Sequence, residues 1–502
     1  MQLTRDLYRN TLTLLTDLYQ LTMAYGYWKS GTAEREAVFS LSFRKHPFGG
    51  GFTLAAGLEH VVEFLQNFRF SREDTDYLAT LTGNDDQPLF EPAFLEYLQH
   101  LRFTCDVDAI PEGTVVFPQE PLLRVRGPIL QCQLIETPLL NMVNFQSLIA
   151  TKAARMVIAT KGEPVLEFGL RRAQGIDGAM TASRAAYIGG CDSTSNVLAG
   201  RLYGIPVKGT HAHSWVMSFE SELESFDTYA AVLPNNCIFL VDTYSTLEGV
   251  RNAIRVGGRL KEKGHRLAGI RLDSGDLAYF SIEARKLLDA AGFGDTSIVA
   301  SNDLDEYIIA SLKEQGAAIN VWGVGTKLIT AYDQPALGAV YKLTAIRYEN
   351  GSGPGIGAWE YKIKLSEQTL KISTPGIQQV RRYTNEKGFT ADMIYDTEHA
   401  PDAATSTMID PTDFTKRRNL SNAWAHEDLL VPILRTGKLV YELPGLEAIR
   451  QRVQQQLPRF HEGIKRFVNP HVYHVGLEKS LYDLKTNLIL ELRNRKREEV
   501  GS

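Results

Sequence analysis

Residues 237–276 read "CIFLVDTYSTLEGVRNAIRVGGRLKEKGHRLAGIRLDSGD" and contain one complete strand–helix–strand unit. The apolar run 237–242 has the length of a buried strand, and the run 267–273 has the same character. The residues between them place apolar side chains three and four positions apart, which is typical of an amphipathic helix. This order predicts a βα unit of a parallel sheet.

The same rhythm continues on both sides of this stretch. Comparable apolar runs occupy residues 164–169, 205–210, 237–242, 267–273, 297–303 and 319–326. Open and closed parallel sheets both fit this period, but a long series of such units favours a barrel. The sequence therefore predicts an α/β fold with a parallel barrel at its centre.

Regions of different character flank this series. Up to residue 128, helical patterns mix with strands such as "EAVFSLSF", which predicts a mixed α+β N-terminal domain. From residue 346 the sequence is typical of short antiparallel strands followed by surface helices, which predicts a smaller C-terminal domain that packs back on the N-terminal domain. We expect the three domains to span residues 1–128, 129–345 and 346–502.

Composition argues against several classes of protein. A chain of 502 residues exceeds one ordinary core, and its formal net charge of −5 argues against a nucleic-acid-binding surface. The four cysteines include no C-x-x-C pair, so we expect neither a disulfide scaffold nor a zinc module. The N-terminal stretch lacks a signal-peptide core and no run is long enough to span a membrane, which predicts a cytoplasmic protein without a membrane partner.

Polar or glycine-rich residues follow each predicted strand. They occupy positions 168–172, 209–214, 242–243, 271–276, 301–303 and 323–326. A barrel assembles its active site from the loops after its strands, so we expect these residues to meet at one mouth.

The residue types at this mouth indicate a ligand. The "GVGT" at 323–326 offers backbone N–H groups and a hydroxyl to a phosphate, although a plain tight turn fits equally well. The "RLDSGD" at 271–276 offers an arginine and carboxylates for ribose or magnesium, or else a helix cap. Phe168 beside Arg171 and Arg172 suits a flat anionic ring. The pattern predicts a sugar phosphate bound together with a small aromatic acid.

The histidine pair in "KGTHAHSWVMSF", residues 208–219, admits three interpretations. His211 and His213 could bind a metal, but the later predicted strands carry no matching set of ligands. One histidine could be packed and the other exposed. In the third interpretation His213 is a nucleophile that accepts phosphate, oriented by Asp242 at the end of the next strand.

Taken together, these motifs closely resemble the nicotinate phosphoribosyltransferase family. "LLTDLYQLTMAYGYW", "FSLSFRKHPFGGGFTLAAGLE", "EFGLRRAQG", "GTHAHSWVM", "RLDSGDL" and "VWGVGTKL" follow one another in the family's order, nearly end to end. The resemblance implies a type II phosphoribosyltransferase, with an irregular α/β barrel, that works as a homodimer. It implies the joining of nicotinate to phosphoribosyl pyrophosphate, giving nicotinate mononucleotide and pyrophosphate in NAD salvage. ATP would be a co-substrate acting through a phosphohistidine.

The resemblance also assigns roles at the reacting centre. The phosphohistidine would be His213, with Asp242 as its orienting partner. Arg271 and Asp273 would address the ribose. Mg²⁺ would be held through the substrate phosphates rather than by a protein-only metal site.

Further residues would bind the substrates. Phe168 and Tyr19 would stack on the two faces of the pyridine ring, with Tyr19 contributed by the partner subunit. Arg171 would lie near the base, and Arg44 would reach the pyrophosphate. The remaining candidates are Thr210, Ser301, Gly325 and Thr326, of which the last two would seat the 5′-phosphate.

Three alternatives remain open at this stage. The amide-using sister family, the nicotinamide phosphoribosyltransferases, has an aspartate at a position that aligns with Asn196, where a neutral residue favours the acid. A barrel metal hydrolase would use His211 and His213 as ligands. A non-catalytic nucleotide-binding protein would keep the fold without turnover.

Overall fold

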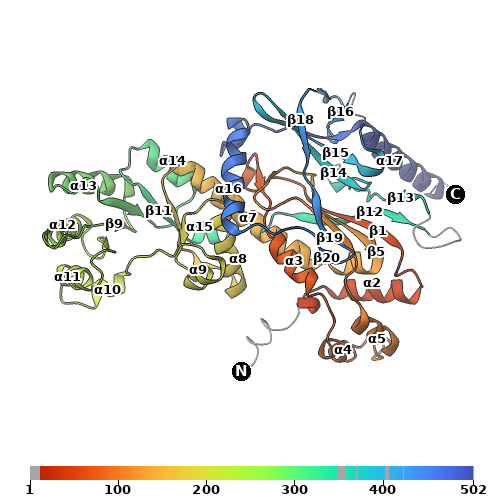
Figure 1. The fold of residues 1–502 in the computed structure, drawn as a ribbon, viewed down its shortest axis with the longest axis horizontal. Coiled ribbons are helices and arrows are strands. Elements are labelled where there is room, and N and C mark those ends of the chain that lie inside the picture. Colours follow the sequence, from red (N-terminus) through yellow and green to blue (C-terminus); the bar gives the residue numbers. More distant parts are fainter. Residues whose placement is uncertain (1–11, 349–356, 369–370, 402–405, 422, 501–502) are drawn as a thin grey trace.

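The computed structural model describes residues 12–348, 357–368, 371–401, 406–421 and 423–500. They form two lobes, with the long helix α7 (Glu136–Thr160) lying between them (Figure 1). One lobe contains the parallel sheet, and the other contains strands from both ends of the chain. None of the described helices combines the length and the apolar character needed to cross a membrane.

The parallel sheet has six strands in the order β7-β6-β11-β10-β9-β8. Its strands are β6 (Val165–Glu167), β7 (Ser193–Thr194), β8 (Ile238–Leu240), β9 (Gly269–Leu272), β10 (Ser297–Ala300) and β11 (Val321–Val324). Its helices are α8 (Gly175–Ile188), α9 (Val197–Tyr203), α10 (His213–Met217), α11 (Glu222–Val232), α12 (Thr246–Glu262), α13 (Leu277–Ala290), α14 (Glu306–Glu314) and α15 (Thr326–Ile329), with the short 3-10 helix η3 (Leu170–Arg172). The predicted α/β fold is confirmed.

The strand order is compatible with an irregular barrel that has one open seam between the two edges of the sheet. Strands β8 to β11 follow one another across the sheet, and β11 pairs with β6. Beyond β7, the predicted strand 205–210 contributes only an isolated bridge between Thr194 and Val207. The seam therefore lies between Val207 and β8, and the arrangement is compatible with the predicted irregular barrel.

Helix α12 shows how the sequence produces this packing. Val250, Val256 and Leu260 recur at helical spacing and are buried. Burial of each such side chain contributes about 2 kcal/mol to the stability of the fold. Gly249 allows close approach to the sheet, because a Cβ there would lie 2.0 Å from the carbonyl oxygen of Val241.

The second lobe is built on a seven-stranded sheet in the order β13-β12-β1-β5-β3-β19-β20. Its strands are β1 (Glu36–Phe43), β3 (Asp106–Ala109), β5 (Pro121–Pro128), β12 (Ala339–Arg347), β13 (Trp359–Tyr361), β19 (Val431–Arg435) and β20 (Lys438–Leu439). A small pair is formed by β2 (Thr53–Leu54) and β4 (Val115–Val116). The helices and 3-10 helices here are η1 (Leu12–Leu14), α2 (Leu18–Lys29), η2 (Pro47–Gly49), α3 (Leu58–Gln66), α4 (Arg72–Leu78), α5 (Pro92–His100) and α6 (Ile129–Leu134).

A six-stranded sheet of the C-terminal region completes this lobe. Its order is β17-β16-β21-β15-β14-β18. The strands are β14 (Gln378–Asn385), β15 (Gly388–Asp396), β16 (Ser406–Ile409), β17 (Arg417–Leu420), β18 (Ala425–Asp428) and β21 (Val475–Glu478). The helices and 3-10 helices of this region are η5 (Thr397–His399), α16 (Leu446–Gln456), η6 (Leu457–Arg459), η7 (Glu462–Lys465) and α17 (Lys479–Val500).

Sheet membership does not follow the predicted domain boundaries. Strand β12, placed by the sequence in the region 129–345, pairs with β1. Strands β13, β19 and β20 of the region 346–502 extend the same sheet. An alternating pattern identifies a strand but not its partner, so these long-range pairings are visible only in the fold.

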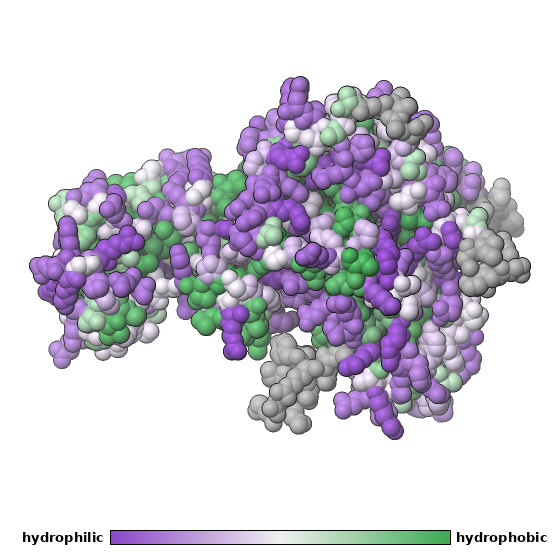
Figure 2. All heavy atoms as spheres, in the orientation of Figure 1, coloured by the Kyte–Doolittle hydropathy of each residue, from purple (hydrophilic) through white to green (hydrophobic). Residues whose placement is uncertain are grey.

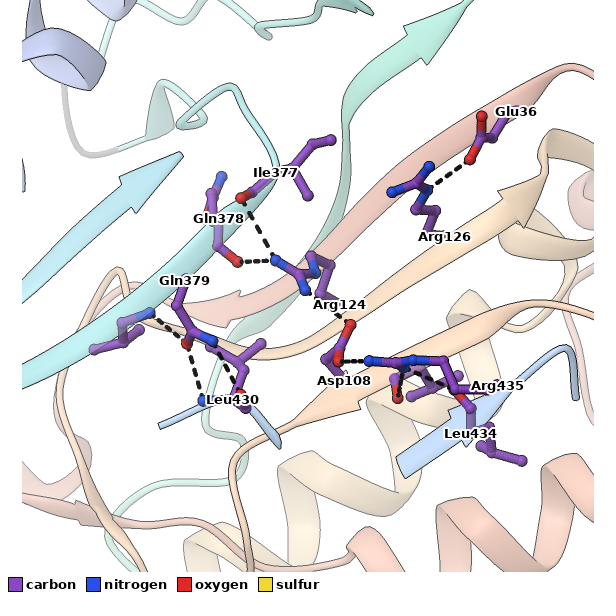
Figure 3. Close-up of polar contacts among 12 residues, drawn as sticks. Glu36, Asp108, Arg124, Arg126, Ile377, Gln378, Gln379, Leu430, Leu434 and Arg435 are labelled. Atoms are coloured by element: carbon purple, nitrogen blue, oxygen red, sulfur yellow. Dashed lines mark hydrogen bonds and ion pairs between the residues drawn. The ribbon is translucent and has the colours of Figure 1, made fainter. Parts of the chain in front are cut away.

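Polar contacts of Arg124 and Asp108 join strands within the seven-stranded sheet and link that sheet to the six-stranded one, as Figure 3 shows. Arg124 on β5 donates to the carbonyl oxygen of Gln378 on β14 at 2.8 Å and to Asp108 on β3 at 2.8 Å. Asp108 also accepts from Arg435 on β19 at 2.6 Å. The N-terminal and C-terminal strands are therefore fixed into a single lobe.

Candidate active site

A cavity of about 490 Å³ opens at the carboxyl ends of the parallel strands. Its lining comes from the turns after β6, β7 and β9 and from the segment that leads into α10. The predicted residues that line it are Phe168, Arg171, Thr210, His213, Arg271 and Asp273. Residues more than 100 positions apart in the sequence thus meet at the mouth where the strand-end rule placed them.

Arg271 is the centre of the polar network in this cavity. Its guanidinium donates to Ser301 Oγ at 2.8 Å, to Thr210 Oγ1 at 3.0 Å and to Asp273 Oδ1 at 2.7 Å. The same guanidinium lies 5.7 Å from the centroid of the Phe168 ring. One cation therefore holds residues from the ends of separate strands and stands beside an aromatic face.

Asp273 is a carboxylate in this network. Burial by itself would raise the pKa of Asp273, but the hydrogen bond from Ser301 and the charge of Arg271 lower it below its ordinary value. The side chain is 28% exposed, so an ionised oxygen is accessible from the cavity.

Gly323 sets the position of the Phe168 ring. A Cβ at Gly323 would lie 2.8 Å from two atoms of that ring, too close for either group to stay in place. Phe168 is also fixed through its backbone, because its N–H donates to the carbonyl oxygen of Val324 at 2.7 Å. The sequence analysis named the "GVGT" motif for phosphate and missed this packing role of its first glycine.

Of the two histidines in the H-x-H pair, His211 is the packed one. It is only 7% exposed, and its Nε2 accepts from the backbone N–H of Leu240 at 3.2 Å, across the seam of the sheet. Burial lowers its pKa to about 4, so the ring is neutral at pH 7.

This packing bears on the metal-site interpretation. One ring nitrogen of His211, Nε2, is already engaged in the hydrogen bond from Leu240. Among the described residues, no cluster of three or more His, Cys, Asp or Glu side chains is arranged to hold a metal ion. The geometry gives no support to a hydrolase built on His211 and His213.

His213 is the accessible histidine. It begins α10, its side chain is 39% exposed, and it lines the cavity. Its Nδ1 lies 3.1 Å from Thr243 Oγ1 and its Nε2 lies 3.7 Å from Asp273 Oδ2. Thr243 was not singled out from the sequence, although it directly follows Asp242.

Asp242 has neighbours other than the predicted one. Its Oδ2 accepts from the backbone N–H of Asp273 at 2.8 Å and from Ser274 Oγ at 2.6 Å. Its Oδ1 is buried without a hydrogen-bond partner among the described residues. In this structure, then, Asp242 holds the turn that carries Asp273, and no hydrogen bond joins it to His213.

Asn196 does not line the cavity. It is 2% exposed and caps α9, where its Oδ1 accepts from Ala199 N at 3.2 Å and its amide donates to Ser183 Oγ at 3.3 Å. The preceding residue, Ser195, lines the cavity instead. Ser195 was not named from the sequence, because the turn after β7 decides which side chain faces the mouth.

The predicted phosphate seat lies beside Phe168. Gly325 precedes α15, and a Cβ there would lie 3.5 Å from the carbonyl oxygen of Phe168. Thr326 begins that helix. Their backbone N–H groups are at the amino end of a helical turn, the geometry expected of a phosphate site.

Two predicted residues lie away from the cavity of their own chain. Tyr19, on α2, is 50% exposed. Arg44 follows β1 and lines a different, small cavity together with Lys342 and Lys371. Both belong to the lobe that contains the seven-stranded sheet.

Known proteins resemble this chain over nearly its whole length. Models of the N-terminal domain of nicotinate phosphoribosyltransferase, of the nicotinate phosphoribosyltransferase family and of its C-terminal domain match residues 14–144, 164–352 and 377–485. The nicotinate phosphoribosyltransferase of Bacillus subtilis (strain 168) is 46% identical over 498 residues, covering 98% of each chain. The human enzyme of that name is 38% identical over 533 residues, covering 95% of this chain and 96% of its own.

A solved structure agrees with these similarities. The crystal structure of human nicotinic acid phosphoribosyltransferase superposes with a TM-score of 0.81 at 36% identity, covering 94% of this chain and 99% of that one. Its likeness extends over both lobes. The chain therefore belongs to the nicotinate phosphoribosyltransferase family.

Proposed function

We propose that this protein joins nicotinate to phosphoribosyl pyrophosphate, giving nicotinate mononucleotide and pyrophosphate, as a step of NAD salvage. The observation that carries the proposal is the cavity in which Arg271 contacts Thr210, Asp273 and Ser301 beside the Phe168 ring. Such a site offers an aromatic face to a base and a charged, hydroxyl-rich wall to a sugar phosphate.

The base would bind at Phe168. Its half-buried ring offers a stacking face, and the exposed guanidinium of Arg171 is available to a carboxylate. Ser195 is the neutral side chain at this part of the wall. A neutral residue there does not repel the negatively charged carboxylate of nicotinate.

The ribose would bind at Arg271 and Asp273, which line the cavity. Its 5′-phosphate would bind at Gly325 and Thr326, beside the backbone of Phe168. As the bond from C1 of the ribose to pyrophosphate breaks, pyrophosphate leaves with the electron pair and positive charge develops at C1. The ring nitrogen of nicotinate then forms the new bond, and the carboxylate of Asp273 offsets the developing charge.

Magnesium would be held mainly through the substrate phosphates. The carboxylates of Asp242 and Asp273 at the same strand ends fit this ion, because oxygen ligands are those that Mg²⁺ prefers. When bound, the ion would supply neutralisation of the leaving pyrophosphate.

ATP would act through phosphorylation of His213. This side chain is accessible from the cavity, and a phosphoryl group on it would add negative charge next to Asp273 and the Arg271 network. The added charge would favour the arrangement of the site that is productive for synthesis.

A product assay tests this proposal. Phosphoribosyl pyrophosphate and Mg²⁺ are supplied with nicotinate or nicotinamide, each with and without ATP, for the wild type and His213→Ala. We expect nicotinate mononucleotide from nicotinate, faster with ATP, with that stimulation lost in His213→Ala. Turnover of nicotinamide would assign the sister activity, and no product from either base would refute the transferase proposal.

Replacing Gly323 with alanine should weaken binding of the base. The added Cβ displaces the Phe168 ring, so we expect KM for nicotinate to rise about five-fold, since an aromatic contact contributes about 1 kcal/mol. Steady-state kinetics with varied nicotinate measures this. Gly258→Ala, at a position on α12 with no neighbour within 4 Å, is the matched control. An unchanged KM in Gly323→Ala would contradict the stacking role of Phe168.

The proposed enzyme is a homodimer in which Tyr19 enters the partner's cavity. Tyr19 lies on α2 beside the exposed apolar residues Leu18 and Met23, which are 53% and 42% exposed. On the other lobe, apolar side chains gather over α9 and the adjoining part of α8 (Figure 2), where Val197 and Leu202 are 71% and 62% exposed. Two exposed apolar faces in different lobes suit a two-fold dimer in which each face of one chain contacts the other face of its partner.

We also propose a cytoplasmic location for this enzyme. The four cysteines are free, buried thiols, the state expected in a reducing compartment.

A further inference from the structure

The imidazole ring of His213 has a polar neighbour at each nitrogen. Nδ1 lies 3.1 Å from the hydroxyl oxygen of Thr243, and Nε2 lies 3.7 Å from a carboxylate oxygen of Asp273. His213 begins α10, Thr243 follows β8 and Asp273 follows β9. The orientation of the ring therefore depends on contacts between three separate segments of the barrel.

The chemistry of these neighbours indicates which nitrogen carries the proton. We assign the hydrogen of the neutral ring to Nε2, because the polar group that faces it 3.7 Å away, the carboxylate of Asp273, can only accept. Nδ1 then has the free lone pair. The hydroxyl of Thr243 can act as donor or acceptor, and beside a lone pair it donates.

We propose that Thr243 is a positioning residue for the transfer of a phosphoryl group from ATP to His213. This inference rests on the proposed function. The role falls to Thr243 because Asp242 makes no hydrogen bond to His213, and its Oδ2 accepts from the backbone N–H of Asp273 and from Ser274 Oγ. Thr243 is the residue that contacts the lone-pair nitrogen directly.

The transfer step involves one bond that forms and one bond that breaks at the γ-phosphorus of ATP. The lone pair of Nδ1 forms a bond to the γ-phosphorus, the bond from that phosphorus to the bridging oxygen breaks, and ADP leaves with the electron pair. The positive charge that develops on the ring is offset by the carboxylate of Asp273 near Nε2. The hydroxyl of Thr243 turns from the lone pair to an oxygen of the transferred phosphoryl group, to which it donates.

Thr243→Val tests this role, since valine keeps the shape of threonine and removes the hydroxyl. Phosphohistidine formed from ATP is quantified by ³¹P NMR or by acid-labile phosphate. Synthesis of nicotinate mononucleotide is measured with and without ATP. We expect phosphorylation to slow about ten-fold, as for the loss of one oriented hydrogen bond. The ratio of the ATP-stimulated to the ATP-independent rate should fall toward one.

Two further variants separate positioning from packing. Thr243→Ser keeps the hydroxyl and should restore most of the phosphorylation rate. Tyr244→Phe changes the next residue, whose side chain is 68% exposed, and should behave as the wild type. Normal phosphorylation in Thr243→Val, or equal loss in Thr243→Ser, overturns the inference.

The same experiments distinguish an error in the role of Thr243 from an error in the proposed function. If the wild type makes nicotinate mononucleotide and forms phosphohistidine while Thr243→Val does the same, only the role of Thr243 falls. If the wild type makes the product but forms no phosphohistidine, the ATP coupling and the role of Thr243 both fall. If the wild type makes no product, the transferase proposal itself fails.

Discussion

Arg271→Gln should lower kcat/KM for nicotinate mononucleotide synthesis about 10²- to 10³-fold, the effect expected when a preorganised charged donor is removed from an active site. The guanidinium of Arg271 is 16% exposed and holds Thr210, Asp273 and Ser301 in one network. Glutamine cannot contact all three, and it leaves the carboxylate of Asp273 without its cation. Steady-state kinetics with varied phosphoribosyl pyrophosphate measures the loss.

A matched arginine controls for effects outside the site. Arg251 lies on the exposed face of α12, paired only with Glu248, and Arg251→Gln should retain wild-type kinetics. Thermal unfolding of both variants checks that the fold is kept. If Arg271→Gln retained most of its kcat/KM while folded, the assignment of this cavity as the active site would be wrong.

Mixing two inactive variants should restore activity if Tyr19 works in the partner's cavity. Tyr19→Ala and Arg271→Gln homodimers each have both sites defective. In a mixed dimer the two defects fall in one site, and the other site is intact. Random reassembly of equal amounts therefore gives about a quarter of the wild-type activity, because half of the dimers are mixed and each has one good site.

The control for this experiment pairs two residues of the same cavity. Arg271→Gln mixed with Asp273→Asn leaves every site with one defect, so no activity should return. Light scattering confirms the dimer in each sample. If the Tyr19→Ala mixture gained nothing over its parents, Tyr19 would act within its own chain or not at all.

Local patterns were enough to identify the parallel sheet. Apolar runs separated by amphipathic helices predicted β6 and β8 to β11, because the period of a strand and the period of a helix are written in neighbouring residues. The same pattern missed β7 (Ser193–Thr194), which is too short and too polar to stand out. It also predicted a full strand at 205–210, where only a bridge at Val207 forms.

The strand-end rule predicted much of the cavity. Phe168, Arg271 and Asp273 were named because they follow apolar runs, and they line one mouth in the structure. The rule works because the carboxyl ends of parallel strands all lie along the same edge of the sheet. It could not find Ser195, because the strand that precedes this residue, β7, was not recognised in the sequence.

The sequence by itself determined the α/β series, the strand ends that carry the polar residues and, through the order of its motifs, the resemblance to a family. Tertiary structure alone decided that β12 and β19 join β1 in one sheet, that His211 is packed while His213 is accessible, and that Gly323 positions Phe168. The physical reason is the distance along the sequence between the residues that interact. Helix and strand periods depend on residues a few positions apart, whereas the pairing of strands and the neighbours of each histidine depend on contacts between segments that are distant in the chain.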